Sequence, residues 1–144
     1  MISHSPTVAT GGGSRRSTDI PIRSAARWPA IAALLVAAAA HIPVIAPHLA
    51  EAPYIGALFI ALTVACLILA AALCIADTRT VWDLTILVAG LAVLAYVLSR
   101  TVGLPEIGDD VGNWAEPLGL VSIISESVAV LCGCMASARR PARG

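Results

Sequence analysis

The sequence predicts an all-α, polytopic membrane protein built as a bundle of four transmembrane helices. Of its 144 residues, 58% are hydrophobic and only 12% are charged, whereas an average soluble domain has about 25% charged residues. Four segments are also apolar over the roughly 20 residues that a helix needs to cross a bilayer core about 30 Å thick. Helices are expected because backbone groups in lipid must hydrogen-bond within their own segment.

The first predicted span covers residues 28–47. It follows a tail, residues 1–27, that is rich in Ser, Gly and Arg and is expected to be a disordered cytoplasmic segment. Pro43 is expected to kink the span or end it early. Residues 48–52, between the first two spans, are predicted to form a short outer loop. The alternative is a cleaved signal, but the arginine pair of the tail lies far from the apolar run, so a retained helix is favoured.

The second and fourth predicted spans, residues 54–75 and 117–138, follow similar sequences. Each has at its start a proline, Pro53 or Pro117, that follows an acidic residue by one or two positions, and proline suits the first turn of a helix. A short basic tail, residues 139–144, follows the fourth span. Residues 28–138 therefore form the predicted transmembrane domain.

The third predicted span, residues 81–99, begins near a sequence that is close to a capping box. In this interpretation Thr80 caps the helix and Asp83 lies in its first turn, with Arg79 nearby. Asp83 is then an interfacial residue rather than a buried functional acid.

The arginines predict the orientation of the bundle. Eight of the nine lie on one side of a four-span chain, and these are Arg15, Arg16, Arg23, Arg27, Arg79, Arg139, Arg140 and Arg143. Arg100 alone lies on the other side. The positive-inside rule therefore predicts a multi-pass protein of the plasma membrane with both termini in the cytoplasm.

Four polar side chains lie inside the predicted spans at a similar depth: His41, Thr63, Tyr96 and Glu126. At about 1.5 Å per residue, and with helical side chains leaning toward their own N-terminus, each lies roughly 10–13 Å below the outer surface. These four residues are the candidate polar layer.

Tyr96 and Glu126 also belong to rows of small or polar residues at heptad spacing. The rows are Thr85, Ala89, Ala92, Tyr96 and Ser99 in the third span, and Gly119, Ser122, Glu126, Ala129, Gly133 and Ala136 in the fourth. Such rows are typical of closely packed membrane helices. We therefore expect both rows to face the bundle interior and Tyr96 to hydrogen-bond to Glu126.

Glu126 is the strongest functional candidate. A charged acid at mid-membrane costs at least about 2.5–3.5 kcal/mol on insertion scales, so it is expected to face the interior, to have a partner or to be protonated. It is either a proton-relay or ligand-binding carboxylate, or a protonated clamp between helices. His41 is a ligand, a proton carrier or a packed polar residue.

His48 and Glu51 lie above His41 in the first outer loop. The resulting H-x6-H-x2-E spacing is not an established motif, but mixed imidazole and carboxylate ligands of this kind bind zinc and copper. His41, His48 and Glu51 are therefore a candidate metal site. The favoured expectation is nevertheless that the protein binds no cofactor.

The long outer loop holds the other outer candidates. Arg100 begins it, and four acids are available to pair with this arginine, namely Glu106, Asp109, Asp110 and Glu116. One interpretation is that these pairs fold the loop into a lid over the bundle. The other is a solvated ion pair of small energetic value.

Two segments, "AHIPVIAPHLAEAPYIGALF" and "YVLSRTVGLPEIGDDVGNWAEPLG", resemble uncharacterised small four-helix integral membrane proteins of actinobacteria. The resemblance covers roughly residues 38–130. It implies an integral membrane protein of that type and no particular activity, so no residue role follows from it.

Three function classes remain open. The favoured one is a non-enzymatic accessory or assembly protein that binds a membrane-protein partner or a second copy of itself. The second is binding or transport of a metal ion, proton or small solute through the polar layer. The third, a small membrane enzyme, is disfavoured because no nucleophile–base, phosphate-loop or metalloprotease motif occurs. The lipid bilayer is the expected surrounding, and a net charge of zero indicates no nucleic-acid partner.

Overall fold

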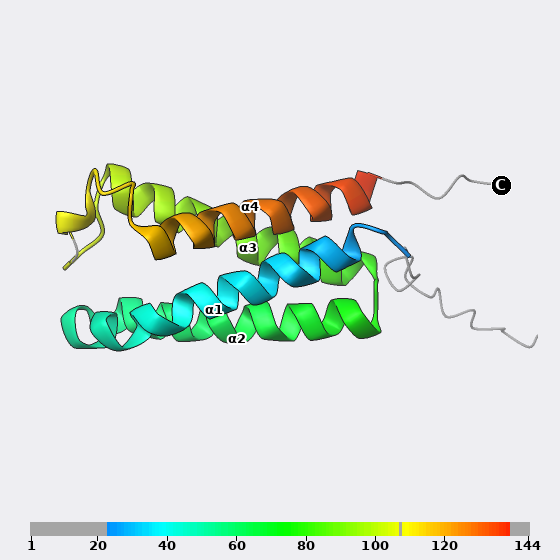
Figure 1. The fold of residues 1–144 in the computed structure, drawn as a ribbon, viewed down its shortest axis with the longest axis horizontal. Helices are drawn as coiled ribbons and strands as arrows, with labels where there is room; N and C mark the ends of the chain where they lie inside the picture. The colour runs from blue at the N-terminus through cyan, green and yellow to red at the C-terminus, as the bar shows by residue number, and fades with distance from the viewer. Residues whose placement is uncertain (1–22, 107, 139–144) are drawn as a thin grey trace, which may run out of the picture.

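The chain is helical throughout most of the residues that the computed structural model describes, which are 23–106 and 108–138, with only the backbone described for Asp109. The four α-helices are α1 (Arg27–Glu51), α2 (Pro53–Ile75), α3 (Arg79–Thr101) and α4 (Pro117–Ala138), and a short 3-10 helix, η2 (Gly108–Asp110), lies between α3 and α4 (Figure 1). All four α-helices are long and apolar enough to cross a membrane. The all-α, four-helix prediction is therefore confirmed. Most of the predicted N-terminal tail and the whole C-terminal tail lie outside the described residues.

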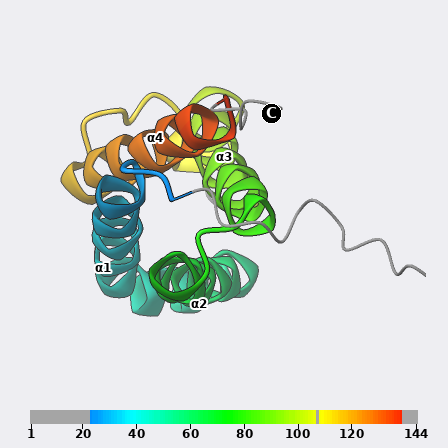
Figure 2. The same cartoon turned by 90° about the vertical axis from the view of Figure 1, so that its right-hand side faces the viewer.

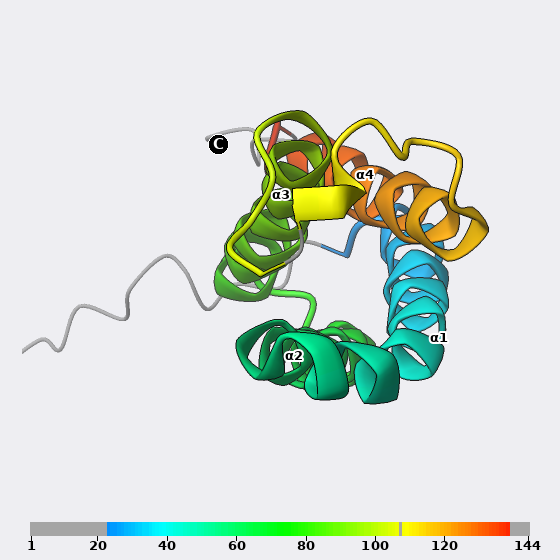
Figure 3. The same ribbon diagram turned by 90° about the vertical axis from the view of Figure 1, so that its left-hand side faces the viewer.

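The helices are arranged around a common axis in the order α2, α1, α4, α3 (Figure 2). α1 packs along α2 and α4, and α4 packs along α3, whereas α2 and α3 share the least extensive contact. α1 begins and α4 ends at the end of the bundle that also holds residues 76–78, which we call the tail end (Figure 1). The opposite end, called the long-loop end, carries Ala52 and the described residues of the long loop, 102–106 and 108–116 (Figure 3).

α1 is longer than the sequence pattern predicted. It runs to Glu51 with Pro43 and Pro47 inside it, so the expectation that Pro43 ends the helix early is wrong. The predicted loop at residues 48–52 is also wrong, because a single residue, Ala52, joins α1 to α2. Each proline removes one backbone hydrogen bond, but an apolar helix that packs along neighbouring helices tolerates that loss.

α3 begins at Arg79, earlier than predicted. Its N-cap is Thr78, whose backbone is extended and whose side chain makes no capping hydrogen bond. Thr80 therefore lies inside the first turn, and the predicted capping role of Thr80 is wrong. Arg79 Nε and Asp83 Oδ2 lie 3.9 Å apart, with more than half of each side chain exposed, so Asp83 has only a weak surface contact.

A buried carboxylate that the sequence pattern did not single out, Asp77, joins three segments at the tail end. It accepts a hydrogen bond from the backbone N–H of Ser24 at 2.8 Å and another from the indole Nε1–H of Trp82 at 2.5 Å. Both Asp77 and Trp82 are buried. These bonds link the chain before α1 to the α2–α3 connection and to the first turn of α3. The only feature of the sequence that indicates this role is the position of Asp77 directly before the N-cap residue of α3.

The rows of small and polar residues face the interior, as predicted. Thr85, Ala89 and Ser99 of α3 are buried, as are Ser122, Glu126, Ala129, Gly133 and Ala136 of α4, and the other members are half-buried. A Cβ atom built on Gly133 would lie only 2.5 Å from Ile86 Cγ1. The small residues therefore allow α3 and α4 to approach closely.

Candidate functional site

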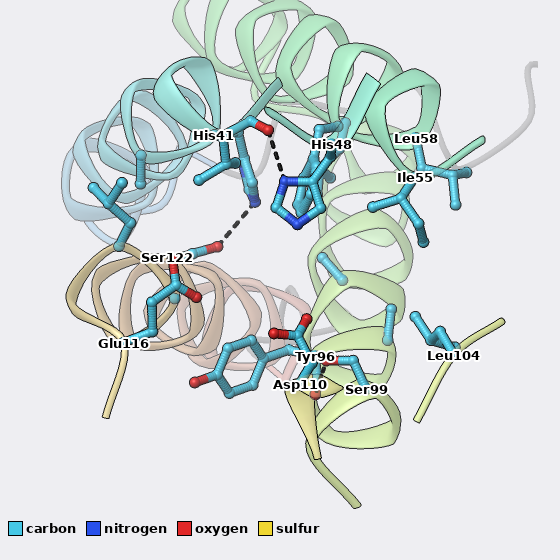
Figure 4. Close-up of a pocket in the computed structure, with 18 of the residues that line it drawn as sticks. His41, His48, Ile55, Leu58, Tyr96, Ser99, Leu104, Asp110, Glu116 and Ser122 are labelled. Carbon is cyan, nitrogen blue, oxygen red and sulfur yellow. Dashed lines mark hydrogen bonds between the residues drawn. The ribbon is translucent and has the colours of Figure 1, made fainter. Parts of the chain in front are cut away.

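A cavity of about 150 Å³ lies in the long-loop half of the bundle. All four helices and the long loop contribute to its lining (Figure 4). Its walls are mainly apolar, with side chains that include Val44, Ile55, Leu58, Phe59, Leu62 and Leu104. An apolar protein cavity of about 150 Å³ is large enough to bind benzene, so this cavity accommodates a molecule with one aromatic ring.

Three polar side chains of α1 and α4 line this cavity and form a hydrogen-bonded group, which we call the polar cluster: His41, Ser122 and Glu126. Ser122 Oγ lies 2.9 Å from His41 Nε2, and this pair is visible in Figure 4. Ser122 Oγ also donates to Glu126 Oε1 at 3.1 Å, and His41 Nε2 lies 3.4 Å from that same Oε1. Glu126 is 1% exposed and His41 is 4% exposed, so the cluster is a buried polar network between two helices.

The arrangement of protons in the cluster follows from its donors. A serine hydroxyl has one proton, and Ser122 directs it to Glu126 Oε1. With Glu126 ionised, the bond between His41 and Ser122 is then donated by Nε2–H of the imidazole. Both contacts of the Glu126 carboxylate therefore end on Oε1, and Oε2 has no hydrogen bond within the described part of the chain.

Two members of the predicted polar layer lie outside the polar cluster. Thr63 Oγ1 donates to the Phe59 carbonyl of its own helix at 2.7 Å. Tyr96 O–H donates to the Trp114 carbonyl at 3.4 Å, so the predicted Tyr96–Glu126 hydrogen bond is wrong. The side chain of Tyr96 is directed to the long loop, a direction that an estimate of depth alone does not give. The hydrogen bond to Glu126 that was expected from Tyr96 comes instead from Ser122, one turn before Glu126.

The candidate metal site made of His41, His48 and Glu51 is not formed. Because α1 stays helical through residue 51, His41 and His48 are two turns apart, about 10 Å along the axis. His48 Nδ1 contacts the Val44 carbonyl at 2.7 Å, and its ring packs on Phe59. Glu51 is exposed. Within the described residues, no three His, Cys, Asp or Glu side chains are placed to hold a metal ion.

Arg100 connects the long loop to the bundle. Its Nη1 lies 2.5 Å from Asp110 Oδ1 and its Nη2 lies 2.7 Å from Glu116 Oε2. The guanidinium also lies over the Tyr96 ring, 5.0 Å from the ring centroid. Arg100 is only 5% exposed, so the interpretation of a solvated ion pair is wrong for this residue.

The long loop consequently lies over the cavity as a lid. Arg100, Leu104, Asp110 and Glu116 all line the cavity from this side. A further contact holds the loop to α2, because the Tyr54 hydroxyl donates to the Pro105 carbonyl. Of the other two acids considered for Arg100, Glu106 is exposed, and the side chain of Asp109 lies outside the described residues.

The contact between Ser122 and His41 has the length of a nucleophile–base pair, a pairing that no sequence motif indicated. The rest of a hydrolytic triad is not built around it. In such a triad the acid orients the base through the second imidazole nitrogen, whereas Glu126 contacts Nε2 and the serine itself. Ser122 also lies in the second turn of α4, where its backbone N–H bonds within the helix and is not free to stabilise an oxyanion.

No protein-family model, no curated protein and no solved structure matches this chain.

Proposed function

We propose that this chain is an integral protein of the plasma membrane that binds a small organic molecule in the cavity of its long-loop half. Four long apolar helices support insertion in the membrane. The arginine distribution supports cytoplasmic termini, with the long-loop end on the outer side. In this orientation the cavity belongs to the outer half of the membrane.

The observation that carries the proposal is the cavity with its polar cluster. Binding sites for small molecules are concave, largely apolar and equipped with a few convergent polar groups. Here the walls come from all four helices, and the polar groups are His41, Ser122 and Glu126 on one side and Arg100, at the end of α3, beside the lid. A polar network used only to clamp helices needs no cavity beside it, because tight packing stabilises the bundle better.

We propose a non-enzymatic role. The position of Glu126 on Nε2 of His41, rather than on Nδ1, supports binding over hydrolysis.

Binding of one-ring probes to the purified full-length protein in detergent micelles tests the proposed function. The probes are benzyl alcohol, benzylammonium and benzoate, each followed by saturation-transfer NMR. At least one is expected to bind, and Ala92→Phe, which places a ring in the cavity, is expected to weaken that binding by about tenfold or more. Ala61→Phe is the matched control, because Ala61 is exposed on α2 and does not line the cavity. Absence of binding by all three probes, or equal effects of both substitutions, would contradict the proposal.

A second candidate function is association with a membrane partner or with a second copy of this chain. All five leucines of α3 lie on one exposed row at heptad spacing: Leu84, Leu87, Leu91, Leu94 and Leu98. A heptad row of leucines is the pattern of a helix–helix seam. If the row is such a seam, Leu87→Ala with Leu91→Ala lowers the oligomer mass measured by light scattering, whereas Leu67→Ala on the exposed face of α2 does not. An unchanged mass in the double variant would contradict this candidate.

A further inference from the structure

Acids are the largest group among the ionisable side chains that line the cavity, and the others are Arg100, Tyr96, His41 and His48. Asp110, Glu116 and Glu126 contribute three carboxyl groups, and Arg100 contributes the one permanent cation. Arg100 is shared between Asp110 and Glu116, at 2.5 and 2.7 Å. These two carboxylates already exceed the charge of the guanidinium by one, whatever the protonation state of Glu126.

Glu126 lies apart from that ion-pair network. Its contacts within the described residues are the hydroxyl of Ser122 and the imidazole of His41, both on Oε1. Its side chain is buried in the half of the bundle that forms the cavity. Oε2 is therefore an unused acceptor, and no arginine lies beside Glu126 within the described residues, where its one basic neighbour is the imidazole of His41.

The surplus of acidic groups selects among ligands by charge. Electrostatic interactions are stronger in a low-dielectric interior than in water, so an anion would be repelled by the carboxylates and a cation attracted. A carboxylate forms its strongest hydrogen bonds with charged donors such as an ammonium group. The apolar walls and the ring of Phe59 favour an organic body on that cation over a hydrated metal ion.

We propose that the cavity takes a small organic cation, a protonated primary amine on an apolar body with about one aromatic ring, and that the Glu126 carboxylate receives the ammonium group through Oε2. This inference rests on the proposed function, because it assigns the ligand class of the same cavity. Glu126 is in this role a ligand-binding carboxylate, and His41 and Ser122 hold it in position through Oε1.

The matched probes test the ligand class, because benzylammonium, benzyl alcohol and benzoate have similar shapes and different charges. Benzylammonium is expected to bind at least about tenfold more tightly than benzyl alcohol, the factor that corresponds to one charge-assisted hydrogen bond. Benzoate is expected to bind most weakly. The substitution Glu126→Gln keeps the size of the side chain and removes its charge. It is expected to weaken benzylammonium binding by about tenfold and to leave benzyl alcohol binding within about threefold.

Retained benzyl alcohol binding in Glu126→Gln also shows that the variant is folded. Equal binding of benzylammonium and benzyl alcohol in the unsubstituted protein, or tightest binding of benzoate, would overturn the cation inference while leaving the cavity a binding site. Loss of both benzylammonium and benzyl alcohol in Glu126→Gln would also overturn it, since charge would then not be the selective feature. Absence of binding by all three probes would overturn the inference and the proposed function together.

Discussion

Substituting Gly56 with Ala is expected to lower the free energy of unfolding by about 2 kcal/mol, within the range measured for overpacked cores. A Cβ atom at Gly56 would lie 2.5 Å from Leu49 Cγ and 2.7 Å from the Leu49 backbone nitrogen. A side chain can turn away from such a contact, but a backbone nitrogen moves only with its helix. Because Ala52 alone joins α1 to α2, the two helices cannot separate near Gly56 without straining their connection.

The matched control for Gly56 is Gly90→Ala on α3. A Cβ atom at Gly90 meets no atom within 4 Å, and Ala favours a helix over Gly by up to about 1 kcal/mol. Gly90→Ala is therefore expected to leave the stability unchanged or to raise it. Unfolding of each variant by SDS in mixed micelles measures both effects. Equal stability of the two alanine variants would show that α1 and α2 do not approach as closely at Gly56 as the structure places them.

Substituting Arg100 with Met is expected to lower the free energy of unfolding by about 2–3 kcal/mol and to release the long loop. The substitution keeps much of the apolar stem and leaves Asp110 and Glu116 facing each other without a cation. Breaking a fully buried ion pair costs about 3–5 kcal/mol. We expect less here because the side chains of Asp110 and Glu116 are 26% and 35% exposed.

Hydrogen exchange distinguishes release of the loop from general destabilisation. The Gly112 amide donates to the Arg100 carbonyl at 2.9 Å, so its exchange is expected to accelerate more in Arg100→Met than exchange in the middle of α4. Arg79→Met is the control, since the Arg79–Asp83 pair is exposed and 3.9 Å long and is worth less than about 1 kcal/mol. The free energy of unfolding of Arg100→Lys is expected to lie between those of the unsubstituted protein and Arg100→Met. Lysine keeps the positive charge but lacks the bidentate geometry of the guanidinium. An Arg100→Met protein as stable as Arg79→Met would rule out the lid contact.

The inward orientation of Glu126 was predictable from the sequence, whereas its partners were not. Burial follows from the cost of a charged acid in lipid and from the small-residue row on which Glu126 lies. Depth along the helix axis then placed His41 and Tyr96 at a similar level. Depth does not specify which helices are neighbours, however, and α1 packs on α4. That contact brings His41 to Glu126, while the Tyr96 side chain is directed to Trp114.

The long loop and the prolines of α1 also show that local sequence patterns do not specify contacts between distant segments. Pro43 was expected to kink the first span or end it early, but α1 runs on to Glu51, and its packing along α2 and α4 outweighs the loss of two backbone hydrogen bonds. The acids available to Arg100 were visible in the sequence, but which of them bind the guanidinium depends on the path of residues 102–116 in space. Asp77 left almost no signal, because its role comes from Ser24, 53 residues earlier in the chain.

The sequence by itself determined the four apolar helices, the two inward-facing rows and the interior position of Glu126. These features depend on interactions between residues close in the chain and on the cost of exposing polar groups to lipid. Only the tertiary structure decided that His41 and Ser122 are the partners of Glu126, that Arg100 closes the long loop over a cavity, and that His48 and Glu51 stay apart from His41. Each of these outcomes requires the order of the helices around the bundle axis, which heptad spacing and hydropathy leave undefined.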